Sequence, residues 1–184
     1  MFRGLPTGDL PDPSLSNIEQ CQKIPRCLLA LETRNSTLVN AKLVMEDVPA
    51  LNALSLPSQT IGEPISQQGQ LAYKAVIMIE GNDVSTGLKW AMLSKSIVVM
   101  PRPAKSSWFM EELLQPYVHY VPIKPDMSDV DAQVRWIVDN DKLAHRIAIR
   151  GSMWVNDMLF HDDAEEEERQ IEREILSRYE ALFI

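Results

Sequence analysis

The sequence has few cysteines, little positive charge and no long apolar run, and each shortage excludes a class of protein. Its 184 residues are 45% hydrophobic and 24% charged, which is typical of one globular domain rather than of a disordered or fibrous chain. No window approaches the roughly 20 apolar residues of a membrane-spanning helix. The opening stretch MFRGLPTGDLPDPSLS also lacks the apolar core of a secretory signal. We therefore expect a soluble protein that does not span a membrane and has no targeting segment.

The two cysteines and three histidines form no recognisable reactive set. Cys21 and Cys27 are six residues apart, a spacing that matches no common zinc or redox motif, so we interpret them as buried or free thiols. The histidines are scattered, and no Ser-His-Asp or Cys-His arrangement follows from the spacing. Hydrolase chemistry therefore has no support in the sequence.

Negative charge dominates the chain, whose formal net charge is −8. Residues 162–174 alone contain eight acidic residues and two arginines, a net charge of −6, so the remainder is nearly neutral. A nucleic-acid-binding surface needs clustered Lys and Arg, so we expect no nucleic-acid partner. We predict an acidic C-terminal helix at 161–184, with its charged side in solvent.

Apolar runs alternate with turn and helix patterns between residues 73 and 123. The runs AVIMI and SIVVM are continuous, which is typical of strands covered on both faces. Successive strand-helix-strand units imply a parallel sheet with right-handed crossovers, so the sequence predicts a Rossmann-like α/β domain with flanking helices. The expected order is strand 75–79, turn 80–83, helix 85–95, strand 96–100, helix 106–114 and strand 117–123.

The flanking segments are expected to be irregular at the start and helical at the end. The proline-rich residues 1–25 predict a loop with at most a short helix at 16–23, and CLLALE at 27–32 predicts the first strand. Residues 46–70 predict a long connection with short helical turns. Three helices should follow: one capped by Ser128 and Asp131, one at about 142–160 and one at about 164–182.

The turn Glu-Gly-Asn-Asp at 80–83 has the composition of a phosphate-binding turn. A strand that ends in a glycine turn and leads into a helix presents backbone N–H groups and a positive helix end at the sheet edge. Gly81 would let a ligand approach the main chain, and Ser85 or Thr86 could cap the helix or bind a phosphate oxygen. The same residues suit a turn that binds nothing, so the local pattern leaves both interpretations open.

Four segments of the sequence resemble one enzyme family. They are YKAVIMIEGNDVSTGLKWAMLSKSIVVMPRP, WFMEELLQPYVHYVPIKPDMSDVDAQVRWI, AHRIAIRGSMWV and the opening FRGLPTG. Together they resemble the carboxyl-terminal part of glycosyltransferase family 90, which includes capsule-associated and lipopolysaccharide-modifying transferases and the protein O-glucosyltransferases. The similarity extends over almost the whole chain.

The resemblance implies an inverting transferase of the GT-B type, with two Rossmann-like lobes. The second lobe binds a nucleotide-sugar, usually a UDP-sugar, and the first carries the acceptor site and a catalytic Asp. This chain, 1–184, would be the second lobe alone, a single nucleotide-sugar-binding domain with a donor-side loop at 1–25. It would contain no catalytic residue, use no cofactor and be inactive by itself. The implied donor contacts are Arg3, Gly4, Leu5, Glu80, Gly81, Asn82, Asp83, Val84, Ser85, Thr86, Gly87 and Lys89.

One departure from the family pattern concerns the charge of the leaving group. The protein O-glucosyltransferases carry a diphosphate-binding Arg where this sequence has Gly87. Lys89 and Arg3 are the candidate replacements, because a departing diphosphate needs positive charge in a water-poor site. Lys89 could instead be a solvent-facing helix lysine. Glu80 could accept bonds from ribose or sugar hydroxyls, or be a surface acid at a strand end.

Two Asp-x-Asp patterns, at 129–131 and 139–141, raise the question of a metal. Neither follows a predicted strand. Both lie at expected helix ends, where acidic residues cap helices and favour the dipole, so we predict no metal.

The expected partners are a UDP-sugar and a glycan or protein acceptor. A missing N-terminal lobe, or a second copy, could cover the apolar side of the last helix, formed by Ile171, Ile175, Tyr179 and Leu182. Full-length eukaryotic relatives would work in the secretory pathway and bacterial ones in the cytoplasm. The alternative function is a non-catalytic nucleotide-sugar-binding or protein-interaction module.

Overall fold

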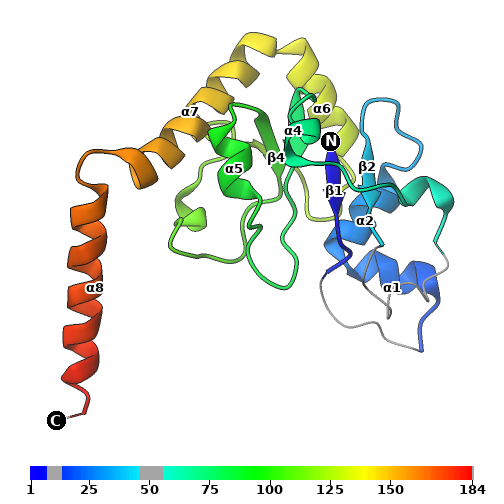
Figure 1. The fold of residues 1–184 in the computed structure, drawn as a ribbon. Coiled ribbons are helices and arrows are strands. Elements are labelled where there is room, and N and C mark those ends of the chain that lie inside the picture. Colours follow the sequence, from blue (N-terminus) through cyan, green and yellow to red (C-terminus); the bar gives the residue numbers. More distant parts are fainter. Residues whose placement is uncertain (8–13, 46–55, 184) are drawn as a thin grey trace.

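Two small parallel sheets lie at the centre of the structure, and helices pack on both sides of them (Figure 1). The computed structural model describes residues 1–7, 14–45 and 56–183. The strands are β1 (Phe2–Gly4), β2 (Ala41–Leu43), β3 (Ala75–Ile77), β4 (Ile97–Met100) and β5 (Val121–Pro122). The helical elements are α1 (Asn17–Lys23), α2 (Pro25–Glu32), η1 (Ser58–Thr60), α4 (Gln67–Gln70), α5 (Leu88–Leu93), η2 (Glu111–Leu113), α6 (Val130–Asp139), α7 (Asp141–Phe160) and α8 (Ala164–Glu180). The predicted α/β class with parallel strands and flanking helices is confirmed.

The described strands pair in parallel. β1 pairs with β2, and β4 lies between β3 and β5. The Ile77 N–H donates to the Met1 carbonyl at 2.8 Å, which joins the two sheets where the chain enters β1 and leaves β3. Counted across this junction, the strand order is β2-β1-β3-β4-β5, one of the common orders of doubly wound α/β folds.

The central strands are buried on both faces, as their continuous apolar runs predict. Ile77 and Val99 belong to a cluster that includes residues of α1, α2 and α6. Val76 and Val98 point to the other face, where they belong to a cluster with residues of α5. Because successive residues of a strand point to opposite faces, a strand covered on both sides needs apolar residues at every position.

Residues 27–32 form the larger part of α2, so the predicted first strand is wrong. Pro25 occupies the first turn of this helix, where its missing N–H breaks no helical hydrogen bond. The run CLLALE consists mostly of good helix formers and has no β-branched residue. A short apolar run cannot be assigned to strand or helix from periodicity alone.

A disulfide joins α1 to α2. It links Cys21 and Cys27, whose Cα atoms are 5.1 Å apart and whose side chains are fully buried. The expectation of burial is confirmed, but the interpretation as free thiols is wrong, because the corner between the two short helices brings both sulfur atoms together.

The first 25 residues are more ordered than an irregular loop. The short helix predicted at 16–23 is α1, and Ser16 and Glu19 form a capping box at its start. β1 was not predicted, because a three-residue strand has too few positions for a periodic pattern. The predicted loop also includes residues 8–13, which lie outside the described residues. The connection predicted at 46–70 contains η1 and α4 as short helical turns, and its first part, 46–55, likewise lies outside.

The predicted helix at 106–114 is a loop with the single turn η2. Met110 has a φ of 53°, in the left-handed region, which no right-handed helix can include. The carboxylate of Glu111 accepts hydrogen bonds from the N–H and the hydroxyl of Ser107, which hold this loop in a non-helical path. The predicted strand at 117–123 shortens to β5, since Tyr117 also has a positive φ, of 59°.

The C-terminal helices α6, α7 and α8 agree with the prediction, but the capping box at α6 does not form. The helix begins after Asp129 without a side-chain cap. The Ser128 hydroxyl donates to Asp126 at 2.8 Å, and Asp131 accepts a hydrogen bond from the Ser36 hydroxyl at 2.6 Å. Both members of the expected box are therefore bound elsewhere.

The last helix, α8, extends away from the rest of the described chain (Figure 1). All residues from 165 to 183 are exposed, including those of its apolar side: Ile171, Ile175, Tyr179 and Leu182. The exposure expected for this side is confirmed. Within the described ranges, no helix is long and apolar enough to cross a membrane.

We expect the apolar side of α8 to drive self-association at high protein concentration, because pairing removes apolar area from water. Added salt should strengthen the association, since it screens the repulsion between the acidic residues 162–168 of two copies. Replacing Ile175 by Glu should keep the chain monomeric. Sedimentation over a range of concentrations measures this. A monomer at every concentration, with strong hydrogen-exchange protection over 171–183, would contradict the prediction.

Candidate functional site

The junction between β1 and β3 is where the strand order changes direction. The chain passes from β1 outward to β2, and then returns to β3, β4 and β5 on the other side. In open α/β sheets such a switch point leaves a crevice beyond the carboxyl ends of the two strands, where ligands bind. The segments at this point are residues 5–7, from the opening motif, and residues 78–83, which include the predicted phosphate turn. The fold therefore brings together two segments that the sequence analysis selected separately.

Arg26, in the first turn of α2, links these two segments. Its Nε donates to the Ile79 carbonyl at 3.1 Å, and its Nη1 donates to the Leu5 carbonyl at 3.3 Å. No described residue accepts a hydrogen bond from Nη2. Burial lowers the pKa of the Arg26 guanidinium from its usual value, although an arginine remains charged in a protein. A cation thus lies beside the turn, and one nitrogen of its fork has no acceptor among the described residues.

The sequence analysis missed Arg26. Residues 27–32 were predicted as a strand, and in that arrangement Arg26 would not begin a helix that faces the switch point. The sequence shows only a basic residue directly after Pro25, and the structure shows that this pair begins a helix. No motif marks that combination, so only the tertiary structure selects it.

The predicted phosphate turn closes on itself but leaves several N–H groups unpaired. The Gly81 N–H donates to the Asp83 carbonyl at 3.1 Å, and the Val84 N–H donates to the Asp83 carboxylate at 2.8 Å. The other N–H groups have no hydrogen-bond acceptor among the described residues: Asn82, Asp83, Ser85, Thr86 and Gly87. Unpaired backbone N–H groups in a turn can bind an anion.

Protein atoms occupy the space next to Gly81. A Cβ at this position would overlap the Thr7 hydroxyl and lie 3.0 Å from the guanidinium carbon of Arg26. The missing side chain therefore lets Thr7 and Arg26 approach the turn, whereas the sequence suggested the approach of a ligand. Any larger residue would push the cation away from the turn.

The helix after the turn begins later than predicted. α5 starts at Leu88, and its N-cap, Gly87, makes no side-chain cap. Neither Ser85 nor Thr86 caps it; the Ser85 hydroxyl lies 3.6 Å from the sulfur of Met78. Because α5 has only six residues, its dipole is small, and the unpaired N–H groups and nearby cations matter more.

Position 87 leaves little room for a side chain such as the arginine of the protein O-glucosyltransferases. A Cβ on Gly87 would lie 3.2 Å from both the Met78 sulfur and the indole nitrogen of Trp90. An arginine here would require one of these side chains to move. The departure at Gly87 is therefore consistent with the packing around it.

Glu80, at the end of the strand region, is bound to the loop that follows β4. Its carboxylate accepts the N–H groups of Ala104 and Lys105, each at 3.2 Å. The Lys105 ammonium in turn donates to the carbonyls of Gly81 and Asn82, at 2.8 and 2.9 Å. Glu80 thus holds the loop after β4 beside the turn.

Lys89 is half-buried beside a carboxylate rather than an exposed helix lysine. Its side chain is 18% exposed, and its Nζ lies 2.8 Å from Oε1 of Glu111, whose side chain is 2% exposed. The ammonium also lies 5.0 Å from the centre of the Phe109 ring. Burial raises the pKa of Glu111, but hydrogen bonds from Lys89 and Ser107 outweigh this effect and hold the pKa below its usual value. The charge of Lys89 is therefore already balanced.

Arg3 of the opening motif is bound to the main chain near β2. Its Nη1 donates to the carbonyls of Phe2 and Asn40, and its Nε to the carbonyl of Glu63. The Leu5 carbonyl accepts a hydrogen bond from Arg26. Gly4, between Arg3 and Leu5, is the last residue of β1. Of the predicted contacts in this motif, Leu5 is the one that the described hydrogen bonds connect to the turn.

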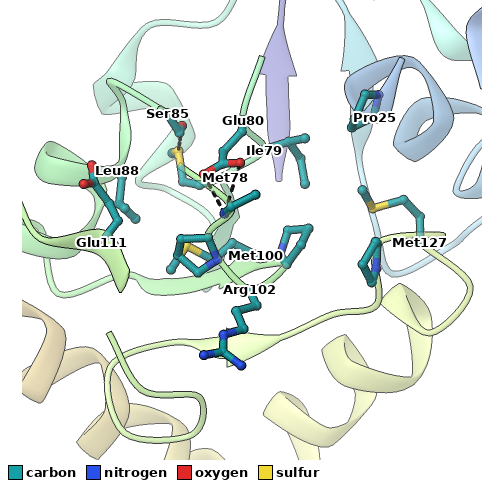
Figure 2. A pocket seen from close by; sticks show the side chains of 14 residues that line it. Pro25, Met78, Ile79, Glu80, Ser85, Leu88, Met100, Arg102, Glu111 and Met127 are labelled. Carbon is teal, nitrogen blue, oxygen red and sulfur yellow. Dashed lines mark hydrogen bonds between the residues drawn. The ribbon is translucent and has the colours of Figure 1, made fainter. Parts of the chain in front are cut away.

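A pocket of about 200 Å³ opens beyond the carboxyl ends of β3, β4 and β5 (Figure 2). Methionine and proline side chains form much of its lining. Figure 2 shows Pro25 and Met127 on one side and Leu88 and Glu111 on the other, with the Arg102 side chain pointing away. Pockets that hold a whole small-molecule ligand usually start at ~300 Å³, so this pocket is smaller than such a site. The pocket suits one ring of a larger ligand.

Among the described residues, no group of three or more His, Cys, Asp or Glu could hold a metal ion. Asp129 accepts the Lys124 N–H at 2.8 Å, and Asp141 forms an ion pair with Lys74. These two acids of the Asp-x-Asp patterns have protein partners. The absence of a metal from the reaction stays a prediction.

The family model of glycosyl transferase family 90 matches residues 19–167. The chain belongs to this family. The match contains Arg26, the turn at 80–87 and the pocket, whereas Arg3, Gly4 and Leu5 precede it. The resemblance found in the sequence is therefore confirmed for most of the chain.

Relatives of this family 90 chain occur in bacteria and animals. It is 36% identical over 110 residues to the O-glucosyltransferase LpsA of Dichelobacter nodosus, a match that covers 60% of this chain and 35% of that protein. It is 31% identical over 140 residues to Protein O-glucosyltransferase 1 of Rattus norvegicus, covering 74% of this chain and 34% of that protein. The corresponding Homo sapiens protein is 29% identical over the same length. The chain spans about a third of the length of these relatives.

Proposed function

We propose that this chain binds UDP-glucose and forms the donor-binding part of an inverting O-glucosyltransferase of the GT-B type. The observation that carries the proposal is the position of Arg26, whose guanidinium joins Leu5 of the opening motif to Ile79, directly before the predicted phosphate turn, at the switch point. Family 90 membership supports transferase chemistry, and the names of the O-glucosyltransferase relatives support glucose as the sugar.

The turn and Arg26 have the groups that a diphosphate requires. The N–H groups of the turn that have no acceptor among the described residues would bind phosphate oxygens. Nη2 of Arg26, which likewise has no described acceptor, would balance charge as the nucleotide leaves. The adjacent apolar pocket would hold one ring of the donor. In this arrangement Arg26 replaces the arginine that is absent at Gly87.

The two acids that line the pocket already have partners, which supports a catalytic base from outside this chain. Glu80 accepts two main-chain N–H groups, and Glu111 is bound to Lys89 and Ser107. An inverting transfer needs a carboxylate that is free to take the proton of the acceptor hydroxyl. We infer that a separate lobe provides this carboxylate and the acceptor site, and that the reaction needs no metal.

We expect the isolated chain to bind UDP but to form no glycoside. Calorimetry should give weak binding of UDP and much weaker binding of uridine, because the diphosphate supplies most of the contacts. Incubation with UDP-glucose and candidate acceptors should yield product only after the first lobe of a related enzyme is added, since a lobe with one of two substrate sites cannot align the reaction.

The outcomes of these assays separate the proposal from its alternative. UDP binding without transfer, even with an added first lobe, would favour a non-catalytic nucleotide-sugar-binding module. Steady glycoside formation by the isolated chain, lost when one of its own carboxylates is changed, would show that the base lies in this chain. Absence of any UDP binding would overturn the proposed donor site.

A further inference from the structure

Lys105 lies on the carbonyl side of the turn and binds two successive peptide groups. Its ammonium donates to the carbonyls of Gly81 and Asn82. Its main-chain N–H donates to the carboxylate of Glu80. The loop after β4 and the end of the β3 segment therefore hold each other through both the side chain and the main chain of Lys105.

This contact determines where the N–H groups of the turn point. No cis peptide bond occurs in the described residues, and in a trans peptide the carbonyl and the N–H point in opposite directions. Because the carbonyls of Gly81 and Asn82 both point to Lys105, the N–H groups of Asn82 and Asp83 point away from it. These are two of the N–H groups that have no acceptor among the described residues. Two N–H groups on the same side of a turn suit an anion with several oxygens.

The charge of Lys105 strengthens these two donors. A cation at a carbonyl oxygen polarises the peptide group, and hydrogen bonds along one chain of dipoles reinforce each other. Within the described part of the chain, no carboxylate forms an ion pair with Lys105, whereas the ammonium of Lys89 is paired with Glu111. The positive charge behind the turn is therefore not cancelled by a salt bridge.

We propose that Lys105 is a positioning residue for the diphosphate of the donor: it holds the Gly81 and Asn82 carbonyls and thereby presents the Asn82 and Asp83 N–H groups to the phosphates. This inference rests on the proposed function. It differs from the role of Arg26, because Lys105 acts through the main chain of the turn and does not itself contact the phosphates.

The test compares UDP and uridine binding to the wild-type chain, Lys105→Met and Lys105→Arg. Methionine keeps the apolar length of the side chain and leaves the main-chain bonds to Glu80 intact. We expect Lys105→Met to lower UDP affinity about tenfold and to leave uridine affinity unchanged, because only the phosphates use the oriented N–H groups. Arginine can donate to both carbonyls and should restore most of the affinity. Lys95→Met, at an exposed lysine after α5, is the matched control and should bind UDP normally.

The outcomes distinguish this inference from the proposed function. The free protein should show shifted amide signals for Asn82 and Asp83 in Lys105→Met, with an unchanged unfolding temperature. An equal loss of UDP and uridine affinity, or unchanged UDP affinity, would overturn the inference while wild-type binding still supports the proposed function. A wild-type chain that binds no UDP would overturn both.

Discussion

Replacing Arg26 by Ala is expected to lower the affinity for UDP about 100-fold. Hydrogen bonds to a charged group contribute roughly 1.5 to 3 kcal/mol each, and ~2.7 kcal/mol corresponds to a factor of 100. The change removes Nη2 and also breaks the two bonds that join Leu5 and Ile79 across the switch point. Calorimetric titration with UDP measures the effect.

Two further variants separate the charge of Arg26 from its geometry. Arg26→Lys keeps the charge, but a single ammonium cannot reproduce the fork, so we expect an intermediate loss of about tenfold. Arg34→Ala is the control, because it also removes one positive charge. Arg34 lies just past the other end of α2, where it donates to the Leu31 carbonyl, so this change should leave UDP affinity unchanged. Equal losses in Arg26→Ala and Arg34→Ala would mean that only net charge matters, and would refute the assigned site.

Replacing Lys89 by Met is expected to destabilise the fold rather than to weaken donor binding selectively. Removing one partner of a largely buried ion pair leaves the other charge without its counter-ion and costs about 3 kcal/mol. Glu111 would lose its ammonium partner while its side chain stays 2% exposed. For a chain of this length, that loss corresponds to a fall of about 6 to 12 °C in unfolding temperature. Thermal unfolding followed by circular dichroism measures it.

An exposed ion pair provides the control for Lys89. Lys74 pairs with Asp141, and both side chains are exposed, so Lys74→Met should leave the unfolding temperature almost unchanged. A Lys89→Met variant that keeps its unfolding temperature but loses UDP binding would show that Lys89 contacts the donor, as the sequence analysis first suggested.

The stability contributed by the Lys89–Glu111 pair should depend on pH in a defined direction. The folded-state pKa of Glu111 is lowered from its ordinary value of 4.5, so the unfolded state binds the proton more tightly. The contribution is therefore fully present above about pH 4.5 and is lost as the pH falls through the folded pKa. The difference in stability between wild type and Lys89→Met should therefore shrink as the pH falls below about 4.5.

Strong local patterns predicted the centre of the fold and its last helices. β3 and β4 follow from continuous apolar runs, and α7 and α8 are long enough for a sustained period. β1 and β2 have three residues each, and their pairing depends on partners about 40 residues away, which a local pattern cannot contain. The run at 27–32 is apolar enough for either strand or helix, and its α-helical state reflects packing of Cys27 and Leu29 in the core.

The candidate site could be predicted only where a local pattern marks it. The turn at 80–87 is marked by its glycine and polar residues, directly after a strand. Arg26 and Lys105 reach that turn from segments more than 20 residues away, through a helix start and a loop that carry no motif. The partner of Lys89 lies on a segment predicted as a helix, and only its irregular path puts Glu111 beside the ammonium.

The binding of UDP to the turn is the central claim, and amide chemical shifts test it most directly. Addition of UDP to the isotope-labelled chain should shift the amide signals of residues 81–87 and the Nε signal of Arg26, and leave those of α8 unchanged. Gly81→Val should abolish these shifts, because a larger side chain displaces Thr7 and Arg26 from the turn. Shifts confined to other parts of the chain, or none at saturating UDP, would contradict the account.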